Sequence, residues 1–285
     1  PFDDPYGDNI VGLCPVGALL SRDFLYKSRV WYLEPVASVC TGCARCCSVN
    51  VWRRKKDWYL RALGDKMNCT AYRVTPLDNP EINGPWLCNK GYDLHKAMAR
   101  ERVLTPMIAG REVAPQEALA EAARLLAAAK NPAALVSAQA SNEELAAFEA
   151  LMGTRLAVYT RRDCPPAAGE VLEDSFLIRP DKNPNSRGVW DLFGKRPFEA
   201  NAKHDLVLLW GDGADCGAFG DAKVIRLASF ADATDAEPEV IIPVSTTFER
   251  SGSFTNCDGK LNRFEPVFDT PASVLHAGDV FGRLA

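Results

Sequence analysis

The sequence lacks the segments that place a protein in or across a membrane. It contains no run of about eighteen apolar residues, which is the length that a membrane-spanning helix requires. Its first residues, Pro1–Asp4, do not form the basic start of an apolar stretch, so the sequence predicts no signal peptide. We therefore expect a cytoplasmic protein with no direct membrane span.

Histidine is scarce, and positive charge is not in excess. The three histidines, His95, His204 and His276, are scattered, and none pairs with a cysteine or serine at the spacing of a catalytic motif. The net charge of −4 argues against a general nucleic-acid binder. The one basic cluster, Arg53–Lys56, is more typical of a subunit contact than of a platform for single strands. We expect no complete active site in this chain and no nucleic-acid partner.

Cysteine, in contrast, is abundant and clustered. Of the ten cysteines, Cys40, Cys43 and Cys47 lie in one short segment, and Cys88 follows within Trp86–Gly91. Four thiolates are the ligand set of a 4Fe-4S cluster. A structural zinc site uses the same Cys-x2-Cys spacing, and a disulfide is the remaining alternative. In a chain without a signal peptide, clustered cysteines favour metal over disulfides.

The spacing leaves the choice of ligands open at two positions. Cys46 and Cys47 are adjacent, and either can follow Cys43 as the third ligand. Cys46 would copy the bacterial-ferredoxin run, whereas Cys47 makes the spacing Cys-x2-Cys-x3-Cys. Cys69 is a further candidate for the fourth ligand in place of Cys88. An iron-sulfur cluster is the favoured interpretation, with zinc second.

Three segments together resemble the large iron-sulfur subunit of NADH:quinone oxidoreductase, the G subunit of bacterial complex I. They are Cys14–Leu19, with the sequence Cys-Pro-Val-Gly-Ala-Leu, the cysteine run Cys40–Cys47, and Asn79–Gly91. The resemblance is strongest over roughly residues 1–110 and continues weakly to the C-terminus.

This resemblance implies a ligand set. Four cysteines match the ligands of an additional 4Fe-4S cluster that lies off the main electron path of the family: Cys40, Cys43, Cys47 and Cys88. Cys46 then has no metal-binding role. The gap before Cys88 is longer than in the family, and Lys55–Cys69 looks like an insertion, which keeps Cys69 as a candidate substitute ligand.

Cys14 carries a second implication of the resemblance. The segment Cys14–Leu19 matches a segment of the family that supplies the fourth thiolate of a different 4Fe-4S cluster. The other three cysteines of that cluster lie upstream in the family. We therefore expect a second cluster that is partly ligated by Cys14, with a ferredoxin-like segment upstream or on another polypeptide. The alternative is a small buried cysteine with no ligand role.

The composition changes near residue 105, and an alanine-rich helix pattern follows from Pro115. Short apolar runs then alternate with helices or loops, and Ser141–Glu144 reads as a capping box. This alternation predicts an α/β fold with a mostly parallel sheet, whose strands we place at 133–137, 155–159, 205–210, 222–227 and 239–244. Three domains are expected: 1–34 as the end of a ferredoxin-like cluster domain, 35–105 as a 4Fe-4S binding domain, and 106–285 as the α/β domain.

The α/β domain resembles a shortened, degenerate molybdopterin-oxidoreductase domain. We expect no molybdopterin, because a domain of this length can hardly enclose two pterin-dinucleotide grooves. Cys164 is the one cysteine placed like a molybdenum ligand, and it lacks the following His-Gly of formate dehydrogenases.

These features predict an electron-transfer and scaffold subunit in the peripheral arm of an NADH:quinone oxidoreductase. The resemblance implies partners that include a flavin- and NADH-binding subunit and a 2Fe-2S subunit. Two alternatives remain at this point. One is the iron-sulfur subunit of an NAD-linked hydrogenase or formate dehydrogenase, and the other is a zinc-stapled structural module.

Overall fold

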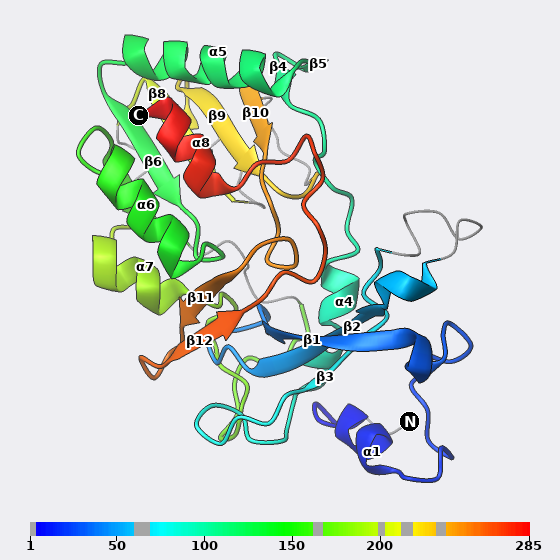
Figure 1. The fold of residues 1–285 in the computed structure, drawn as a ribbon. Helices are drawn as coiled ribbons and strands as arrows, with labels where there is room; N and C mark the ends of the chain where they lie inside the picture. The colour runs from blue at the N-terminus through cyan, green and yellow to red at the C-terminus, as the bar shows by residue number, and fades with distance from the viewer. Residues whose placement is uncertain (1–3, 60–68, 162–167, 199–202, 212–218, 232–237) are drawn as a thin grey trace.

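A computed structural model describes residues 4–59, 69–161, 168–198, 203–211, 219–231 and 238–285. Figure 1 shows a small sheet near the N-terminus and a larger, helix-covered sheet built from later residues. A hairpin of two strands lies between the two sheets.

The small sheet has three antiparallel strands in the order β1-β2-β3. They are β1 (Leu33–Val39), β2 (Ser48–Arg54) and β3 (Arg73–Pro76). Short helical segments surround this sheet: α1 (Asp8–Leu13), η1 (Val30–Tyr32), η2 (Lys56–Trp58), α3 (Asn89–Tyr92) and α4 (Leu94–Ala97). Val49, Val51 and Val74 are buried in its core.

The large sheet has seven strands in the order β5-β4-β10-β9-β8-β6-β7. Five of them are parallel: β6 (Pro132–Val136), β7 (Ala157–Thr160), β8 (Leu206–Trp210), β9 (Lys223–Ala228) and β10 (Val240–Pro243). The antiparallel pair β4 (Met107–Ile108) and β5 (Arg111–Glu112) extends the sheet beside β10. The predicted α/β fold with a mostly parallel sheet is therefore confirmed.

The two faces of the large sheet are covered differently. One face packs against four helices, α5 (Pro115–Ala128), α6 (Asn142–Met152), α7 (Ser186–Phe193) and α8 (Ala277–Leu284). On the other face Leu135, Val207, Leu209 and Val224 pack against side chains that include Tyr159 and Phe198. Burial on both faces explains why these strands read as continuous apolar runs rather than as alternating ones.

Local signals set the ends of two helices as the sequence predicts. Helix α5 begins at Pro115, where a missing N–H group costs no hydrogen bond. Helix α6 follows a complete capping box: the Ser141 hydroxyl accepts from the Glu144 amide, and the Glu144 carboxylate accepts from the Ser141 amide.

Residues before and after position 105, where the composition changes, pack against each other. The core of the small sheet includes Leu177, Phe248 and Val267 from the later part of the chain. The hairpin of β11 (Gly252–Thr255) and β12 (Leu261–Phe264) buries Phe254 and Phe264 against Val39. The three-domain division at residues 34 and 105 stays a prediction. Side chains from both sides of residue 105 pack together in the core of the small sheet.

Among the helices of the described residues, none combines the length and the apolar character that crossing a membrane demands.

Candidate metal centre

The loop that joins β1 to β2 carries three of the predicted ligands. The Cys40 amide donates to the Cys47 carbonyl over 2.9 Å, which extends the ladder one step beyond the Val39–Ser48 pair. Within the loop the Cys46 backbone has a φ of 52°, a left-handed conformation that is uncommon for a residue with a Cβ atom. The Asn262 amide group donates to the Cys46 carbonyl over 2.8 Å and holds this turn.

Cys88 reaches the same place from a distant part of the chain. It is the residue that precedes helix α3, and its carbonyl accepts from the Gly91 amide at 2.9 Å. The preceding residue, Leu87, is held on both sides by Asn9 in α1. The Asn9 side chain donates to the Leu87 carbonyl over 2.7 Å and accepts from the Leu87 amide over 3.2 Å.

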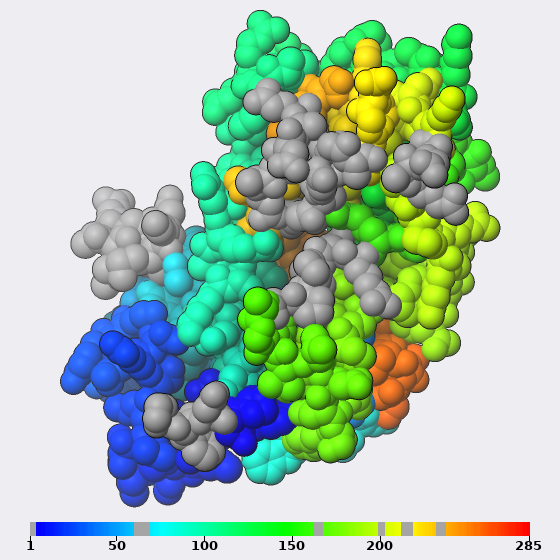
Figure 2. Space-filling view, turned by 180° about the vertical axis from the view of Figure 1, so that it is seen from behind, coloured from blue at the N-terminus to red at the C-terminus, as the bar shows by residue number. Residues whose placement is uncertain are grey.

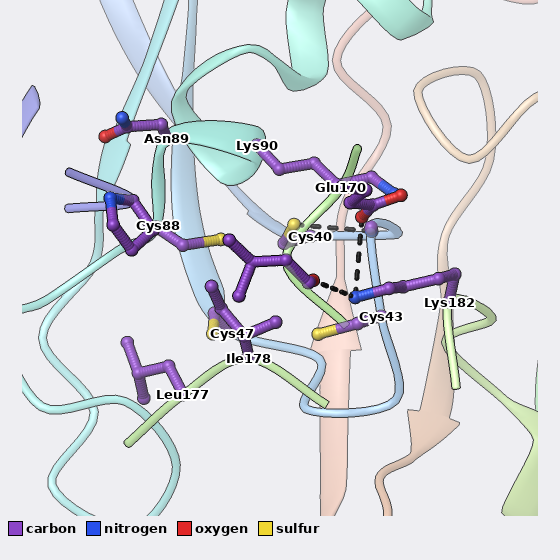
Figure 3. A pocket seen from close by; sticks show the side chains of 13 residues that line it. Cys40, Cys43, Cys47, Cys88, Asn89, Lys90, Glu170, Leu177, Ile178 and Lys182 are labelled. Atoms are coloured by element: carbon purple, nitrogen blue, oxygen red, sulfur yellow. Dashed lines mark hydrogen bonds and ion pairs between the residues drawn. The ribbon is translucent and has the colours of Figure 1, made fainter. Parts of the chain in front are cut away.

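The four cysteines Cys40, Cys43, Cys47 and Cys88 line one cavity of about 160 Å³ (Figure 3), which we call the cysteine cavity. A single water molecule needs only about 10–15 Å³ of such space. Other residues complete the wall: Pro5, Gly42, Asn89, Lys90, Glu170, Val171, Leu177, Ile178 and Lys182.

A third segment, residues 170–182, closes the cavity and is anchored to the N-terminus. The Tyr6 hydroxyl donates to the Asp174 carboxylate and accepts from the Leu177 amide over 3.2 Å. Figure 2 shows the green segment that contains these later residues lying against the blue N-terminal residues, on the face hidden in Figure 1. The cavity is thus built from parts of the chain that lie far apart in sequence.

Burial dominates the electrostatics of the thiols. It raises the pKa of Cys40, Cys47 and Cys88 above the ordinary value, and the neighbouring cysteines raise the pKa of Cys40 and Cys47 further. Backbone N–H groups act in the opposite direction: the Gly42 amide donates to Cys40 Sγ over 3.4 Å. A metal or cluster bound here would have to supply positive charge that compensates for the loss of the thiol protons.

Of the other described cysteines, Cys14, Cys46, Cys69 and Cys257 all lie outside the wall of this cavity. Cys46 is fully buried beside Phe254 and Phe264, and its Sγ donates to the Pro184 carbonyl over 2.9 Å. Cys69 is exposed. Cys14 is not among the cavity-lining residues, and hydrogen bonds from backbone N–H groups, first that of Leu19, lower its pKa. Cys164 falls outside the described residues.

In the part of the chain that the structure describes, no three His, Cys, Asp or Glu side chains converge closely enough to hold one metal ion. The four sulfurs surround a space and do not meet at a point. A four-thiol donor set around such a space fits a polynuclear iron-sulfur group, which brings its own sulfides.

Comparison with known proteins finds relatives that are all the same kind of complex I subunit. The G subunit of the NADH-quinone oxidoreductase of Streptomyces coelicolor is 31% identical over 113 residues, which are 39% of this chain and 12% of that protein. The second G subunit of the Rhizobium meliloti enzyme is 30% identical over 210 residues, which are 71% of this chain and 22% of that protein. The chain belongs to the G-subunit family of complex I. The resemblance predicted from the cysteine segments is confirmed.

The mitochondrial iron-sulfur protein 1 of the NADH dehydrogenase [ubiquinone] of Solanum tuberosum is a further relative, 29% identical over 104 residues, or 36% of this chain and 12% of that protein. The aligned part of the G-subunit-like chain thus spans between 12% and 22% of the length of these three relatives. No family model matches the chain.

The sequence alone did not single out two charged residues of the cavity wall, Glu170 and Lys182. The Lys182 side chain is only 1% exposed. Lysine is among the residues least often buried, so a lysine next to Asp181 and Asn183 gives no sign that it lies inside the protein. Only the folded path of residues 170–182 brings it to the four cysteines.

Gly91 is predicted to be required for the position of Cys88. A Cβ atom at Gly91 would lie 2.5 Å from Leu87 Cδ1, and Leu87 is fully buried next to Cys88. We expect Gly91→Ala to lower the free energy of unfolding by about 1–3 kcal/mol through overpacking, measured by chemical denaturation. Gly12→Ala is the control, because its Cβ would meet only the Tyr92 hydroxyl at 3.6 Å. Equal stability of the two variants would contradict this account.

Proposed function

We propose that this G-subunit-like chain is an electron-transfer and scaffold subunit of an NADH:quinone oxidoreductase, and that it binds one 4Fe-4S cluster through Cys40, Cys43, Cys47 and Cys88. The observation that carries the proposal is that these four thiols, from a hairpin loop and a distant helix start, line one cavity. When bound, such a cluster accepts and releases one electron at a time.

The chain contributes more than ligands to such a site. Leu177 and Ile178 provide an apolar wall that excludes water, and the Gly42 amide points at Cys40 Sγ. Burial and hydrogen bonds to sulfur are two means by which a protein sets the potential of a cluster. These features support a redox cluster in this cavity rather than substrate chemistry within it.

The shape of the site favours a cluster over zinc. A structural zinc ion requires four ligands at about 2.3 Å from one point when all are cysteines. Thiols that surround a cavity of about 160 Å³ instead leave room for a group with several metal atoms. We therefore retain the zinc-stapled module only as an outcome of the test below.

Cys14 is proposed to serve a second 4Fe-4S cluster. One thiolate cannot hold a cubane, so the other ligands would come from a ferredoxin-like segment upstream or from another polypeptide. In this proposal the chain works in the cytoplasmic peripheral arm, beside a flavin- and NADH-binding subunit and a 2Fe-2S subunit. The α/β part serves as a scaffold without molybdopterin. An NAD-linked hydrogenase or formate dehydrogenase would use the same chemistry with other partners.

Metal and sulfide analysis tests the cluster directly. The full chain, purified or reconstituted without oxygen, is expected to hold about four irons and four acid-labile sulfides. Cys69→Ser is the matched control and should leave this content unchanged, because Cys69 is exposed and does not line the cavity. Stoichiometric zinc without sulfide would overturn the proposal.

A further inference from the structure

A buried ammonium group forms part of the wall of the cysteine cavity. Lys182 Nζ donates to three backbone carbonyls, those of Val171 and Leu172 at 2.9 Å and that of Arg179 at 3.0 Å. Three acceptors match the three N–H donors of a protonated lysine, whereas a neutral amine has only two. The geometry therefore indicates a positive charge at a side chain that is 1% exposed.

Two further charges lie beside it. Glu170 Oε1 is 3.4 Å from Lys182 Nζ and 2.7 Å from Lys90 Nζ, and all three residues line the cavity. Figure 3 shows Lys90, Glu170 and Lys182 along one side of the space that the four cysteines surround. Two lysines and one glutamate sum to a net charge of +1 on this wall.

We infer that Lys182 raises the reduction potential of a cluster in the cysteine cavity, and that Glu170 lowers it; this inference rests on the proposed cluster. Reduction transfers one electron from a donor to the cluster, whose charge becomes one unit more negative. A nearby positive charge stabilises the reduced form, and a negative charge destabilises it. Because Lys182 is buried, salt screens its effect far less than that of a surface lysine.

Potentiometric titration of the reconstituted full chain, followed by the electron paramagnetic resonance of the reduced cluster, tests this inference. Lys182→Met is expected to lower the equilibrium constant for reduction about tenfold, which corresponds to about 59 mV for one electron. Glu170→Gln is expected to raise the same constant severalfold. A purely structural role would weaken the fold in either variant, but it would not move the potential in opposite directions.

The control is Lys56→Met, which removes an ammonium group whose side chain is 59% exposed and which does not line the cavity. It should change the equilibrium constant less than about twofold, because solvent screens its charge. If Lys182→Met does not fold, Glu170→Gln decides the question: an unchanged or lowered potential overturns the inference.

The two levels of the proposal fail separately. A wild-type chain that takes up neither iron nor sulfide overturns the proposed function. If the wild-type chain holds an intact cluster, and the equilibrium constant for its reduction changes less than about twofold in both variants, only the role of Lys182 and Glu170 is overturned.

Discussion

Cys47→Ser is expected to abolish binding of the iron-sulfur cluster, whereas Cys46→Ser is expected to leave it bound. Cys47 lines the cysteine cavity, and a hydroxyl group is a much poorer ligand for iron than a thiolate. Cys46 directs its Sγ toward the Pro184 carbonyl instead. Iron and acid-labile sulfide, measured on each variant after the same anaerobic reconstitution, provide the comparison.

The two variants also differ in what they do to the fold. A serine hydroxyl at position 46 can donate to the same carbonyl, but it lies among the apolar side chains of Phe254 and Phe264, so we expect a moderate loss of stability. Equal loss of iron in Cys46→Ser and Cys47→Ser would contradict the assignment of Cys47 as the third ligand.

Phe148→Ala is expected to cost about 3–5 kcal/mol of the free energy of unfolding, measured by denaturant titration. Phe148 is completely buried, with its ring centroid 5.1 Å from that of Phe281 and 5.9 Å from those of Phe193 and Trp210. Removal of the ring therefore opens a cavity at the junction of three helices and the large sheet. The side chains around this cavity are too closely packed to move in and fill it.

Leu151→Ala is the matched control for this change. It lies on the same helix, α6, but its side chain is 38% exposed, so its truncation should cost about 0.5–1 kcal/mol. The folded fraction of Phe148→Ala should still bind the cluster, because Phe148 belongs to a different core from that of the small sheet. Similar losses in the two variants would refute the packing described for α6.

Local patterns were sufficient to predict much of the α/β part. The apolar runs over 205–210 and 222–227 became β8 and β9, because a strand buried on both faces must be apolar at nearly every position. The capping box at Ser141 needed only residues within one helical turn. The antiparallel pair β4 and β5 was not predicted, since two-residue strands carry no periodicity that a sequence can display.

The sequence by itself determined the chemistry that this protein offers: a set of clustered thiols, an apolar sheet, and a resemblance to the G subunit that the comparisons confirm. Only the tertiary structure decided which thiols share a cavity, because Cys46 and Cys47 are adjacent in sequence but face different surroundings. It also brought Lys182 to the wall of that cavity. Burial of an ammonium group depends on acceptors such as the Val171 carbonyl being in place, and such a contact arises from packing of the whole chain rather than from any local pattern.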